Sequence, residues 1–283
     1  MAGMEGKLCV VTGATSGIGL ITAERLAAKG ARLVLVGRDP GRGQAAVGRI
    51  KARRPRAEVG VHYADLSRLD GMRKLASELN ALDKLDVLIN NAGAMFWDRE
   101  VTADGLERTF ALNHLAYFVL SALLRDKLIA SAPARIINVA SEAHRGAKLD
   151  FGDLQYARNY SGIRAYGRSK LCNILFTREL ARRLSGTGVT ANCLHPGFVN
   201  SRFGNNNPGL VGLGTRIAKQ LFAISPERGA ETPVYLASSP EVEGKTGGYY
   251  DRCALSTPSR EAQDDAAARR LWEESARIAG LPA

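Results

Sequence analysis

The sequence predicts an α/β protein built on one doubly wound parallel sheet with helices on both faces. Three observations predict it: short apolar runs typical of strands buried on both faces, helical patterns between successive runs, and glycine-rich or small-residue segments where several runs end. A chain of 283 residues is long enough for one large domain or two small ones. Because no linker, change in composition or internal repeat divides it, we expect a single domain over 1–283.

Composition excludes several other classes of protein. Hydrophobic residues make up 45% of the chain and charged residues 24%, which is ordinary for a soluble globular protein. No apolar run approaches the roughly 18 residues that a membrane span needs, and residues 1–8 are too few for a secretory leader, so we expect a cytoplasmic protein. The cysteines and histidines show no metal-ligand or disulfide spacing, so we expect no metal site. We expect core positions for the cysteines, which are Cys9, Cys172, Cys193 and Cys253.

The net charge of +11 raises nucleic acid or an acidic membrane surface as a partner. The basic residues are mostly dispersed, with one dense patch over 51–56 that follows a helical pattern and that we interpret as a solvated loop. No nucleic-acid-binding motif accompanies the patch, so we expect no nucleic-acid partner. Positive charge also suits a cofactor that carries phosphate.

The chain begins with a strand, a glycine turn and a helix. An apolar run over 8–11 leads into the turn TGATSGIG, a helical pattern over 20–29 ends at Gly30 as C-cap, and a second apolar run follows over 32–36. This is a βαβ unit. Its glycines permit a tight turn, close approach of the backbone to a pyrophosphate and close packing of the helix, whose N-terminus attracts phosphate. The unit predicts dinucleotide binding.

The end of the second strand selects the cofactor. Enzymes that use NAD place an acidic residue there to bind the ribose 2′-hydroxyl. In this sequence Gly37 occupies the position and Arg38 follows. A guanidinium suits a 2′-phosphate by charge and by bidentate geometry, so we expect NADP(H) in preference to NAD(H). The alternative is that Arg38 is solvated and Asp39 binds the hydroxyl.

Strands and helices continue to alternate along the chain. We expect strands at 59–63, 85–89, 135–139 and 189–194, and helices at 69–82, at 109–124 and around Tyr166. Ligands of such sheets bind at the carboxyl ends of the strands. The segments that fall at those ends are 13–19, 90–93, Ser141 and 196–197.

The pattern weakens after Gly197. Residues 200–215 are rich in Gly and Asn, as is typical of a functional loop or lid, and 216–224 is apolar and helix-like, so we expect a substrate loop over about 198–225. A helix over 226–237, a short strand within 245–251 and an amphipathic helix over 261–279 complete the prediction, with the C-terminal strand and helix spanning 245–280.

Tyr166 and Lys170 form a chemically suggestive pair. Four residues apart on a helix, they share one face. A nearby cation lowers the pKa of a phenol from about 10, which lets it exchange a proton with a carbonyl or alcohol oxygen near neutral pH. A pair of this kind in isolation is more often an exposed Tyr above an exposed Lys, so other residues must decide. Tyr160 and Arg164 share the spacing, but Arg offers no proton path.

The chain resembles the short-chain dehydrogenase/reductase family from Lys7 to the C-terminal helix. The resemblance rests on the motifs Thr12-Gly13-x-x-x-Gly17-x-Gly19, Asp65-Leu66, Asn90-Asn91-Ala92-Gly93, Asn113, Ser141, Tyr166-x-x-x-Lys170 and Pro196-Gly197. It implies one Rossmann-type domain with a parallel sheet of about seven strands and a dinucleotide-binding core over 7–197.

Finer motifs are similar to the retinol dehydrogenase-like branch. They include Asn113-His114-Leu115, Ser141-x-Ala143-His144 and His195-Pro196-Gly197. Members of that branch often carry an N-terminal membrane anchor, and the sequence before the first strand shows none, which argues against retinol itself as the substrate. Protochlorophyllide reductases are related and share many of these motifs.

The resemblance implies a role for each catalytic residue. Tyr166 would be the general acid, and Lys170 would lower its pKa and hold the nicotinamide ribose. Ser141 would stabilise the substrate oxygen, and Asn113 would anchor a water that links Lys170 to solvent. The implied cofactor-binding residues are Gly13, Thr15, Ser16, Gly17, Ile18, Gly19, Arg38, Asp65, Leu66, Asn91, Ala92, Gly93, Tyr166, Lys170, Pro196, Gly197, Val199 and Ser201.

The predicted function is an NADP(H)-dependent oxidoreductase that transfers hydride between nicotinamide and a lipophilic carbonyl compound or alcohol. The resemblance also implies a homodimer or homotetramer through the helices that hold Asn113 and Tyr166. Two alternatives remain: a non-catalytic NADP-binding sensor or scaffold, and a double-bond reductase similar to protochlorophyllide reductase. Because Tyr and Lys fill the catalytic roles, we expect His144 and His195 to be structural.

Overall fold

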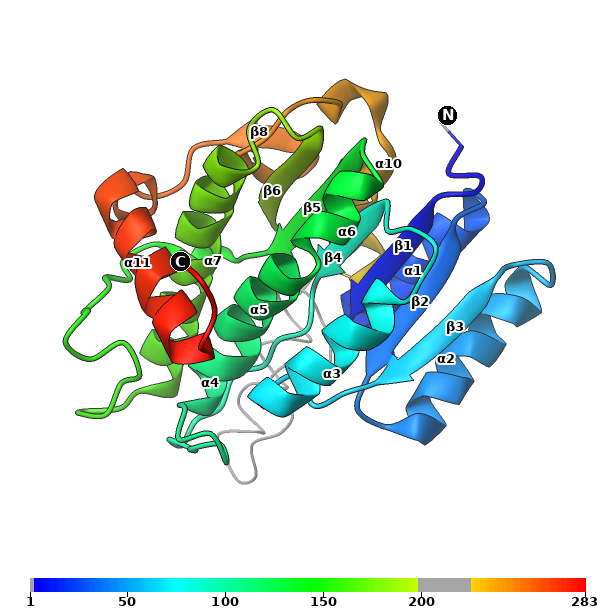
Figure 1. Cartoon of the computed structure of the whole chain (residues 1–283). Helices are drawn as coiled ribbons and strands as arrows, with labels where there is room; N and C mark the ends of the chain where they lie inside the picture. The colour runs from blue at the N-terminus through cyan, green and yellow to red at the C-terminus, as the bar shows by residue number, and fades with distance from the viewer. Residues whose placement is uncertain (1–2, 198–224) are drawn as a thin grey trace.

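A computed structural model describes residues 3–197 and 225–283. Its strands are β1 (Leu8–Thr12), β2 (Arg32–Gly37), β3 (Val59–Tyr63), β4 (Val87–Asn90), β5 (Ala134–Val139), β6 (Val189–His195), β7 (Tyr249–Asp251) and β8 (Ala254–Ser256). In the part of the chain that the structure describes, they form one sheet in the order β3-β2-β1-β4-β5-β6-β7-β8 (Figure 1). The strand order reverses between β1 and β4, where such sheets bind ligands. The predicted doubly wound α/β architecture is confirmed.

The described sheet has one strand more than the expected seven or so. Strands β1 to β7 pair in parallel, whereas β8 pairs antiparallel with β7, with Leu255 opposite Tyr250. Strand β8 is three residues long, and Ala254 and Leu255 are exposed. It therefore carries no buried apolar run from which the sequence could predict it.

Helices cover both faces of the sheet (Figure 1). One face carries α1 (Gly17–Ala28), α2 (Pro40–Arg53), α9 (Pro226–Gly229) and α10 (Glu231–Ser238). The other carries α3 (Leu69–Asn80), α4 (Arg108–Phe110), the π-helical turn η1 (Ala111–Leu115), α5 (Ala116–Leu123), α6 (Arg125–Ala130), α7 (Gly162–Arg183) and α11 (Asp265–Ala279). Short 3-10 turns are η2 (Glu142–His144), η3 (Pro240–Val242) and η4 (Glu261–Gln263).

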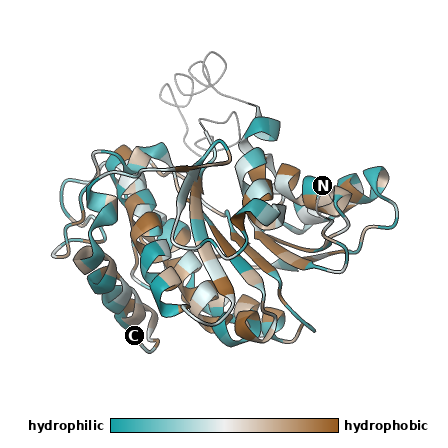
Figure 2. Cartoon of the chain, turned by 90° about the horizontal axis from the view of Figure 1, so that it is seen from above, coloured by the Kyte–Doolittle hydropathy of each residue, from teal (hydrophilic) through white to brown (hydrophobic). Residues whose placement is uncertain are grey.

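Each face of the sheet has its own hydrophobic core. Apolar residues concentrate on the strands between the two helical layers, and hydrophilic residues on the outer helices and loops (Figure 2). Cys9, Cys172 and Cys193 are buried as expected, but Cys253 is half-buried in the β7–β8 turn. None of the helices in the described residues combines the length and hydrophobicity that a membrane span requires.

The basic patch over 51–56 lies partly in a helix, not wholly in the solvated loop that we expected. Helix α2 continues to Arg53, and the patch is exposed throughout. The helix starts at strong signals: Pro40 is its first residue, and the Asp39 carboxylate accepts a hydrogen bond from the Arg42 N–H at 2.8 Å. The capping residues fix where the helix begins. At its other end, the basic side chains of Lys51 and Arg53 are favourable because they interact with the negative end of the helix dipole.

Helix α11 packs along α7 and closes the outer side of one core (Figure 1). Trp272 of α11 lies between Phe118 of α5 and Phe176 of α7, with ring centroids 4.9 and 5.9 Å away. The two phenylalanines are themselves 5.8 Å apart. Aromatic clusters of this kind contribute beyond the area that they bury. The C-terminal helix is therefore part of the core and covers α5 and α7.

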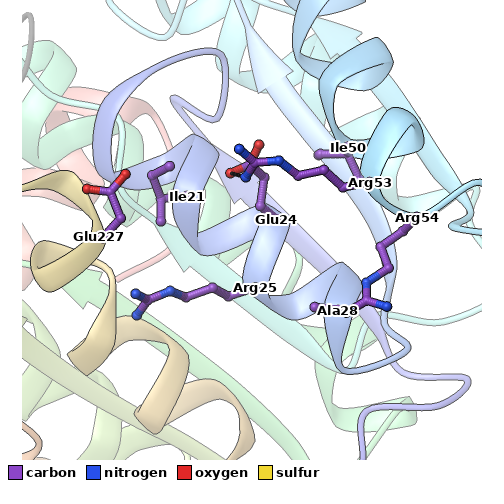
Figure 3. A pocket seen from close by; sticks show the side chains of 8 residues that line it. All are labelled: Ile21, Glu24, Arg25, Ala28, Ile50, Arg53, Arg54 and Glu227. Carbon is purple, nitrogen blue, oxygen red and sulfur yellow. Dashed lines mark hydrogen bonds and ion pairs between the residues drawn. The ribbon is translucent and has the colours of Figure 1, made fainter.

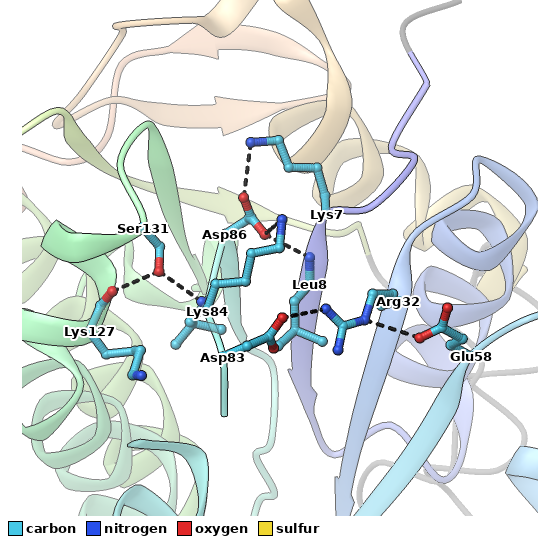
Figure 4. A network of polar contacts seen from close by, with 10 residues as sticks. Lys7, Leu8, Arg32, Glu58, Asp83, Lys84, Asp86, Lys127 and Ser131 are labelled. Atoms are coloured by element: carbon cyan, nitrogen blue, oxygen red, sulfur yellow. Dashed lines mark hydrogen bonds and ion pairs between the residues drawn. The ribbon is translucent and has the colours of Figure 1, made fainter. Parts of the chain in front are cut away.

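A charged network ties the amino ends of the central strands together (Figure 4). The buried Asp86 carboxylate, just before β4, accepts a hydrogen bond from the Leu8 N–H of β1 at 2.8 Å. The ammonium groups of Lys7 and Lys84 lie 2.9 and 3.0 Å from it. Burial alone would raise the pKa of Asp86, but these bonds and charges outweigh burial and hold the pKa below its usual value.

Candidate active site

The glycine turn after β1 lies at the carboxyl edge of the sheet and is tightly packed. Gly13 has φ +66°, and a Cβ there would lie 2.9 Å from the Ala92 Cα. A Cβ on Gly19 would lie 2.5 Å from both the Gly13 carbonyl oxygen and the Asn91 Nδ2. Ser16 is the N-cap of α1, but its side chain makes no capping hydrogen bond. The first N–H groups of α1 thus keep the orientation in which helix N-termini bind phosphate.

Thr12 and Asn91 join the ends of β1 and β4. The Thr12 hydroxyl accepts hydrogen bonds from the N–H groups of Asn91 at 2.9 Å and Ala92 at 3.0 Å. In return, the Asn91 amide donates to the Thr12 carbonyl at 2.8 Å. The Asn91 side chain is therefore committed to shaping the turn. Thr12 is part of the sequence motif. Its hydrogen bond to Asn91, which holds the turn, joins residues 79 positions apart, so spacing in the sequence does not reveal it.

Arg38 follows the end of β2, and Gly37 lies close to the Thr15 side chain. A Cβ on Gly37 would lie 2.4 Å from the Thr15 γ-methyl carbon. Arg38 is exposed, and its charge lowers the pKa of Asp65. Asp39 is already engaged as the N-cap of α2. The alternative in which Asp39 binds a ribose hydroxyl would cost the helix its cap, about 1 kcal/mol.

Asp65 follows β3 and is held by its neighbour. Its carboxylate accepts hydrogen bonds from the Ser67 N–H at 3.0 Å and the Ser67 hydroxyl at 2.8 Å. Burial would raise the pKa of Asp65, but these bonds and the charges of Arg38 and Arg108 hold it below its usual value. Leu66 is buried beside it. The carboxylate is thus fixed and ionised at the same edge as the glycine turn.

Asn113 sits in the π-helical turn η1 and is fully buried. Its amide oxygen accepts from the Ala94 N–H at 2.9 Å, and its amide nitrogen donates to the Ala94 carbonyl at 2.8 Å. The same nitrogen donates to the Ser169 hydroxyl of α7 at 3.0 Å. A Cβ on Gly93 would lie 3.2 Å from the Asn113 oxygen and 3.6 Å from the Lys170 Nζ. Asn113 therefore joins the end of β4 to α7; π-turns often mark such sites.

The structure brings Ser141, Tyr166 and Lys170 together. Tyr166 and Lys170 lie on α7, with the Lys170 Nζ 5.6 Å from the Tyr166 ring centroid. Lys170 is 3% exposed, and its ammonium donates to the Val139 carbonyl at 2.8 Å. The Tyr166 hydroxyl forms a hydrogen bond with Ser141, which follows β5. Lys170 is therefore buried and Tyr166 half-buried, so the pair is not an exposed Tyr above an exposed Lys.

The predicted pKa shift of Tyr166 is wrong in direction for the chain alone. Burial raises the pKa of Tyr166 to about 12, against a smaller lowering by the hydrogen bond with Ser141. Burial also lowers the pKa of Lys170 to about 7. Desolvation disfavours the charged form of each group, and the Lys170 ammonium is directed at a carbonyl instead of the phenol. The pair is therefore a protonated phenol beside a weakly basic amine.

Both histidines that we expected to be structural bind the turn that carries Ser141. The His195 Nδ1 accepts from the Glu142 N–H at 3.2 Å, and the His144 Nδ1 lies 2.6 Å from the Ser141 carbonyl oxygen. Pro196 and Gly197 follow β6 at the same edge. Val199 and Ser201, with the expected substrate loop over about 198–225, lie outside the described residues except for position 225.

A surface pocket lies on the opposite helical face, between α1, α2 and α9 (Figure 3). Its volume is about 410 Å³, and it contains none of the predicted catalytic residues. The Glu24 carboxylate in its wall binds Arg49 at 2.5 Å and Arg53 at 3.0 Å. Because this pocket lies away from the carboxyl edge and from every predicted catalytic residue, it is not the candidate site.

Comparisons with known proteins show the family to which the chain belongs. The family model for short chain dehydrogenases matches residues 7–208. Human retinol dehydrogenase 13 is 41% identical over 288 residues, covering 100% of this chain and 87% of that protein. Retinol dehydrogenase 12 of Mus musculus is 42% identical over 279 residues, covering 98% of this chain and 88% of that protein.

Solved structures give the same result. An uncharacterized protein from Mycobacterium paratuberculosis is similar with a TM-score of 0.79 and 31% identity, over 99% of this chain and 96% of that chain. RhlG of Pseudomonas aeruginosa, solved as an NADP active-site complex, has a TM-score of 0.69 and 29% identity, over 87% of this chain and 94% of that chain. The chain therefore belongs to the short-chain dehydrogenase family and, by its relatives, to the retinol dehydrogenase-like branch of that family.

Proposed function

We propose that this chain is an NADP(H)-dependent oxidoreductase that interconverts a carbonyl compound and an alcohol, with Tyr166 as general acid and base. The observation that carries the proposal is the hydrogen bond between Tyr166 and Ser141 beside the buried Lys170 amine. These groups lie at the carboxyl edge, next to the glycine turn. A nicotinamide, when bound, supplies or accepts the hydride.

The residues of the chain divide the proton chemistry between them. In reduction, Ser141 hydrogen-bonds the substrate oxygen and stabilises its developing charge, while Tyr166 donates a proton to that oxygen. In the chain alone, burial raises the pKa of Tyr166 to about 12, so the phenol holds the proton that it would donate. Lys170, with a pKa of about 7, exchanges a proton near neutral pH and replaces the proton that the phenol loses. Asn113 keeps α7 in register with the end of β4.

Several features support NADP(H) over NAD(H). The first turn of α1 and the close-packed Gly13 and Gly19 form the cradle for a pyrophosphate. Arg38 is exposed where a 2′-phosphate would lie, a side chain in place of Gly37 would have to displace that of Thr15, and Asp39 caps α2. Two structural neighbours, from Pseudomonas aeruginosa and Burkholderia cenocepacia, are NADP complexes.

The relatives support a lipophilic substrate, because those reported above are retinol dehydrogenases by name. The test is NADPH consumption by the purified chain across aliphatic, aromatic and isoprenoid aldehydes and ketones, with Tyr166→Phe beside it. We expect turnover of lipophilic aldehydes by the unsubstituted chain alone. Equal turnover by both proteins would remove Tyr166 from the role of acid, and NADPH binding without turnover of any compound would favour the sensor.

Two further expectations stay predictions: the homo-oligomer through the helices that hold Asn113 and Tyr166, and the cytoplasmic location. The fold bears on the first of them. Because α11 packs on α5 and α7, a partner that approaches this face would meet α11 first. Gel filtration of the full chain beside a Trp272→Asp variant, which weakens that packing, would show whether α11 limits association.

A further inference from the structure

The turn that carries Ser141 is held by the last strand of the parallel sheet, β7, and by the segment after β8. It spans 141–145 and includes η2, with Ser141 as N-cap. The Tyr249 hydroxyl of β7 donates to the Glu142 carboxylate at 2.6 Å, and the Arg145 guanidinium donates to the Thr257 carbonyl at 3.0 Å. Tyr249 of β7 and Thr257, which follows β8, thus hold the turn in place.

His144 makes the most direct of these contacts. Its Nδ1 lies 2.6 Å from the Ser141 carbonyl oxygen, and its Nε2 lies 3.0 Å from the Ser259 backbone nitrogen. A carbonyl only accepts and a backbone N–H only donates, so the ring carries its proton on Nδ1 and is neutral. The ring is fully buried, and the Tyr249 ring lies edge-to-face with it at 5.2 Å. Burial lowers the pKa of His144, which favours the neutral form.

The turn also lies directly against the helix of the catalytic tyrosine. A Cβ on Gly167 would lie 2.6 Å from the Ala143 carbonyl oxygen, so the absence of a side chain after Tyr166 lets the turn contact α7. The Ser141 hydroxyl accepts from the Ala143 N–H at 3.2 Å and bonds with Tyr166. A shift of the Ser141 backbone would therefore move its hydroxyl relative to the phenol.

We propose that His144 is a positioning residue: its neutral ring, protonated on Nδ1, bridges the Ser141 carbonyl and the Ser259 N–H and so sets the Ser141 hydroxyl against Tyr166. The proposal rests on the function proposed above, because positioning matters only if Ser141 acts on a substrate. The competing account is a core histidine that contributes volume and stability alone.

Three substitutions separate the two accounts. Asn carries its amide nitrogen on Cγ, where the Nδ1 of histidine lies, so His144→Asn keeps a donor for the Ser141 carbonyl. Gln reaches the place of Nε2, so His144→Gln keeps an acceptor for the Ser259 N–H but loses the bond to Ser141. His144→Leu keeps only volume. His62→Gln is the matched control, because His62 is a half-buried histidine bonded to Glu78 on β3 and α3.

The experiment measures kcat and KM for reduction of a lipophilic aldehyde, NADPH affinity and the thermal midpoint for each variant. We expect kcat to fall about 10- to 100-fold in His144→Gln and His144→Leu with NADPH affinity unchanged. His144→Asn should stay within about fivefold of the unsubstituted chain, and His62→Gln should match it. Equal losses in Asn, Gln and Leu, losses that follow only the thermal midpoint, or no loss in any variant would overturn the proposal.

An NMR measurement distinguishes failure of this inference from failure of the proposed function. Ring ¹⁵N shifts of His144 in the unsubstituted chain report which nitrogen is protonated, without any turnover. We expect Nδ1–H. If the chain shows this tautomer but reduces no substrate, the proposed function fails and the positioning role fails with it; an Nε2–H or charged ring in an active chain overturns the positioning role alone.

Discussion

The two edges of the sheet bury charge in opposite ways. At the amino edge, Asp86 is 4% exposed and is met by two ammonium groups and a backbone N–H. At the carboxyl edge, Lys170 is 3% exposed, and none of the described residues forms an ion pair with it; its ammonium meets a carbonyl. The pKa of Asp86 falls below its usual value because bonds to the charged form outweigh burial, whereas burial lowers that of Lys170 to about 7.

The difference teaches what each edge does. A buried charge with matched partners keeps its charge and holds strands together, whereas a buried charge without a counter-ion is unstable and exchanges its proton near neutral pH. We therefore propose that the amino ends of the parallel strands contribute stability and that the carboxyl ends carry the proton chemistry. Five predictions test this contrast and the cofactor site beside it, from the largest expected effect to the smallest.

Tyr166→Phe should remove the chemistry of the carboxyl edge and leave the fold intact. We expect kcat to fall about 10²- to 10⁴-fold or more, because the general acid is lost, while NADPH affinity and the thermal midpoint change little. Tyr235→Phe, which deletes a hydroxyl bonded to Glu241 on the opposite helical face, is the control and should keep its activity. If Tyr166→Phe retains the original kcat, the contrast between the edges has no catalytic meaning.

Asp86→Asn should lower the stability of the fold and leave the activity intact. Removing the charge weakens the hydrogen bonds that Lys7, Lys84 and the Leu8 N–H make with Asp86, so we expect a loss of about 2 kcal/mol in the free energy of unfolding with kcat of the folded protein unchanged. Asp83→Asn at the same edge removes an exposed partner of Arg32 and should cost less than about 1 kcal/mol. Urea unfolding of both variants measures the difference; equal losses would contradict a special role for the buried network.

Low pH should remove the contribution of Asp86 to stability. The pKa of Asp86 is lower in the folded than in the unfolded chain, so its contribution is full above the unfolded value of about 3.9 and is lost as pH falls through the folded value. The stability difference between Asp86→Asn and the unsubstituted chain should therefore shrink below pH of about 4.

Lys170→Met should stabilise the chain while it destroys activity. The pKa of Lys170 is about 7 in the folded chain against a reference of 10.5, so its contribution is fully present above the reference value and lost as pH falls toward 7. At pH 7 we expect a gain on the order of 2 kcal/mol after subtraction of the hydrogen bond to Val139. The gain in the free energy of unfolding should vanish as pH approaches the reference value of 10.5. A variant less stable than the unsubstituted chain at pH 7 would show that burial of the amine does not destabilise the fold.

Arg38→Asp should change the cofactor without changing the chemistry. Loss of the guanidinium and gain of a carboxylate should shift the ratio of kcat/KM for NADPH over NADH by about tenfold or more, because one charged hydrogen bond is worth about 1.5–3 kcal/mol. Arg42→Ala, which removes a cation from the same helix start, serves as control. An unchanged ratio would place recognition of the 2′-phosphate elsewhere.

The sequence predicts best where the signal is local. Apolar runs at 8–11 and 32–36 became β1 and β2 because strands buried on both faces need such runs. The i, i+4 spacing placed Tyr166 and Lys170 on one face of α7. Both depend on neighbours within a few residues, so spacing carries the information.

Spacing fails where burial or long-range contact decides. The pKa of Tyr166 was predicted in the wrong direction because how deeply the pair lies is not visible in the spacing. The Asp86 network joins residues 78 positions apart, and His144 meets Ser259 across 115 positions. Strand β8 exists through pairing with β7 and not through its own hydrophobicity.

The central claim is that Tyr166 and Ser141 act together on one substrate oxygen at the carboxyl edge. Its most direct test is a crystal structure of the chain with NADP and a bound alcohol or unreactive carbonyl analogue. The account predicts that both hydroxyls lie within about 3 Å of the same ligand oxygen, with that ligand against the nicotinamide. A Tyr166 hydroxyl turned away from the ligand, or a ligand oxygen bound by other groups, would contradict it.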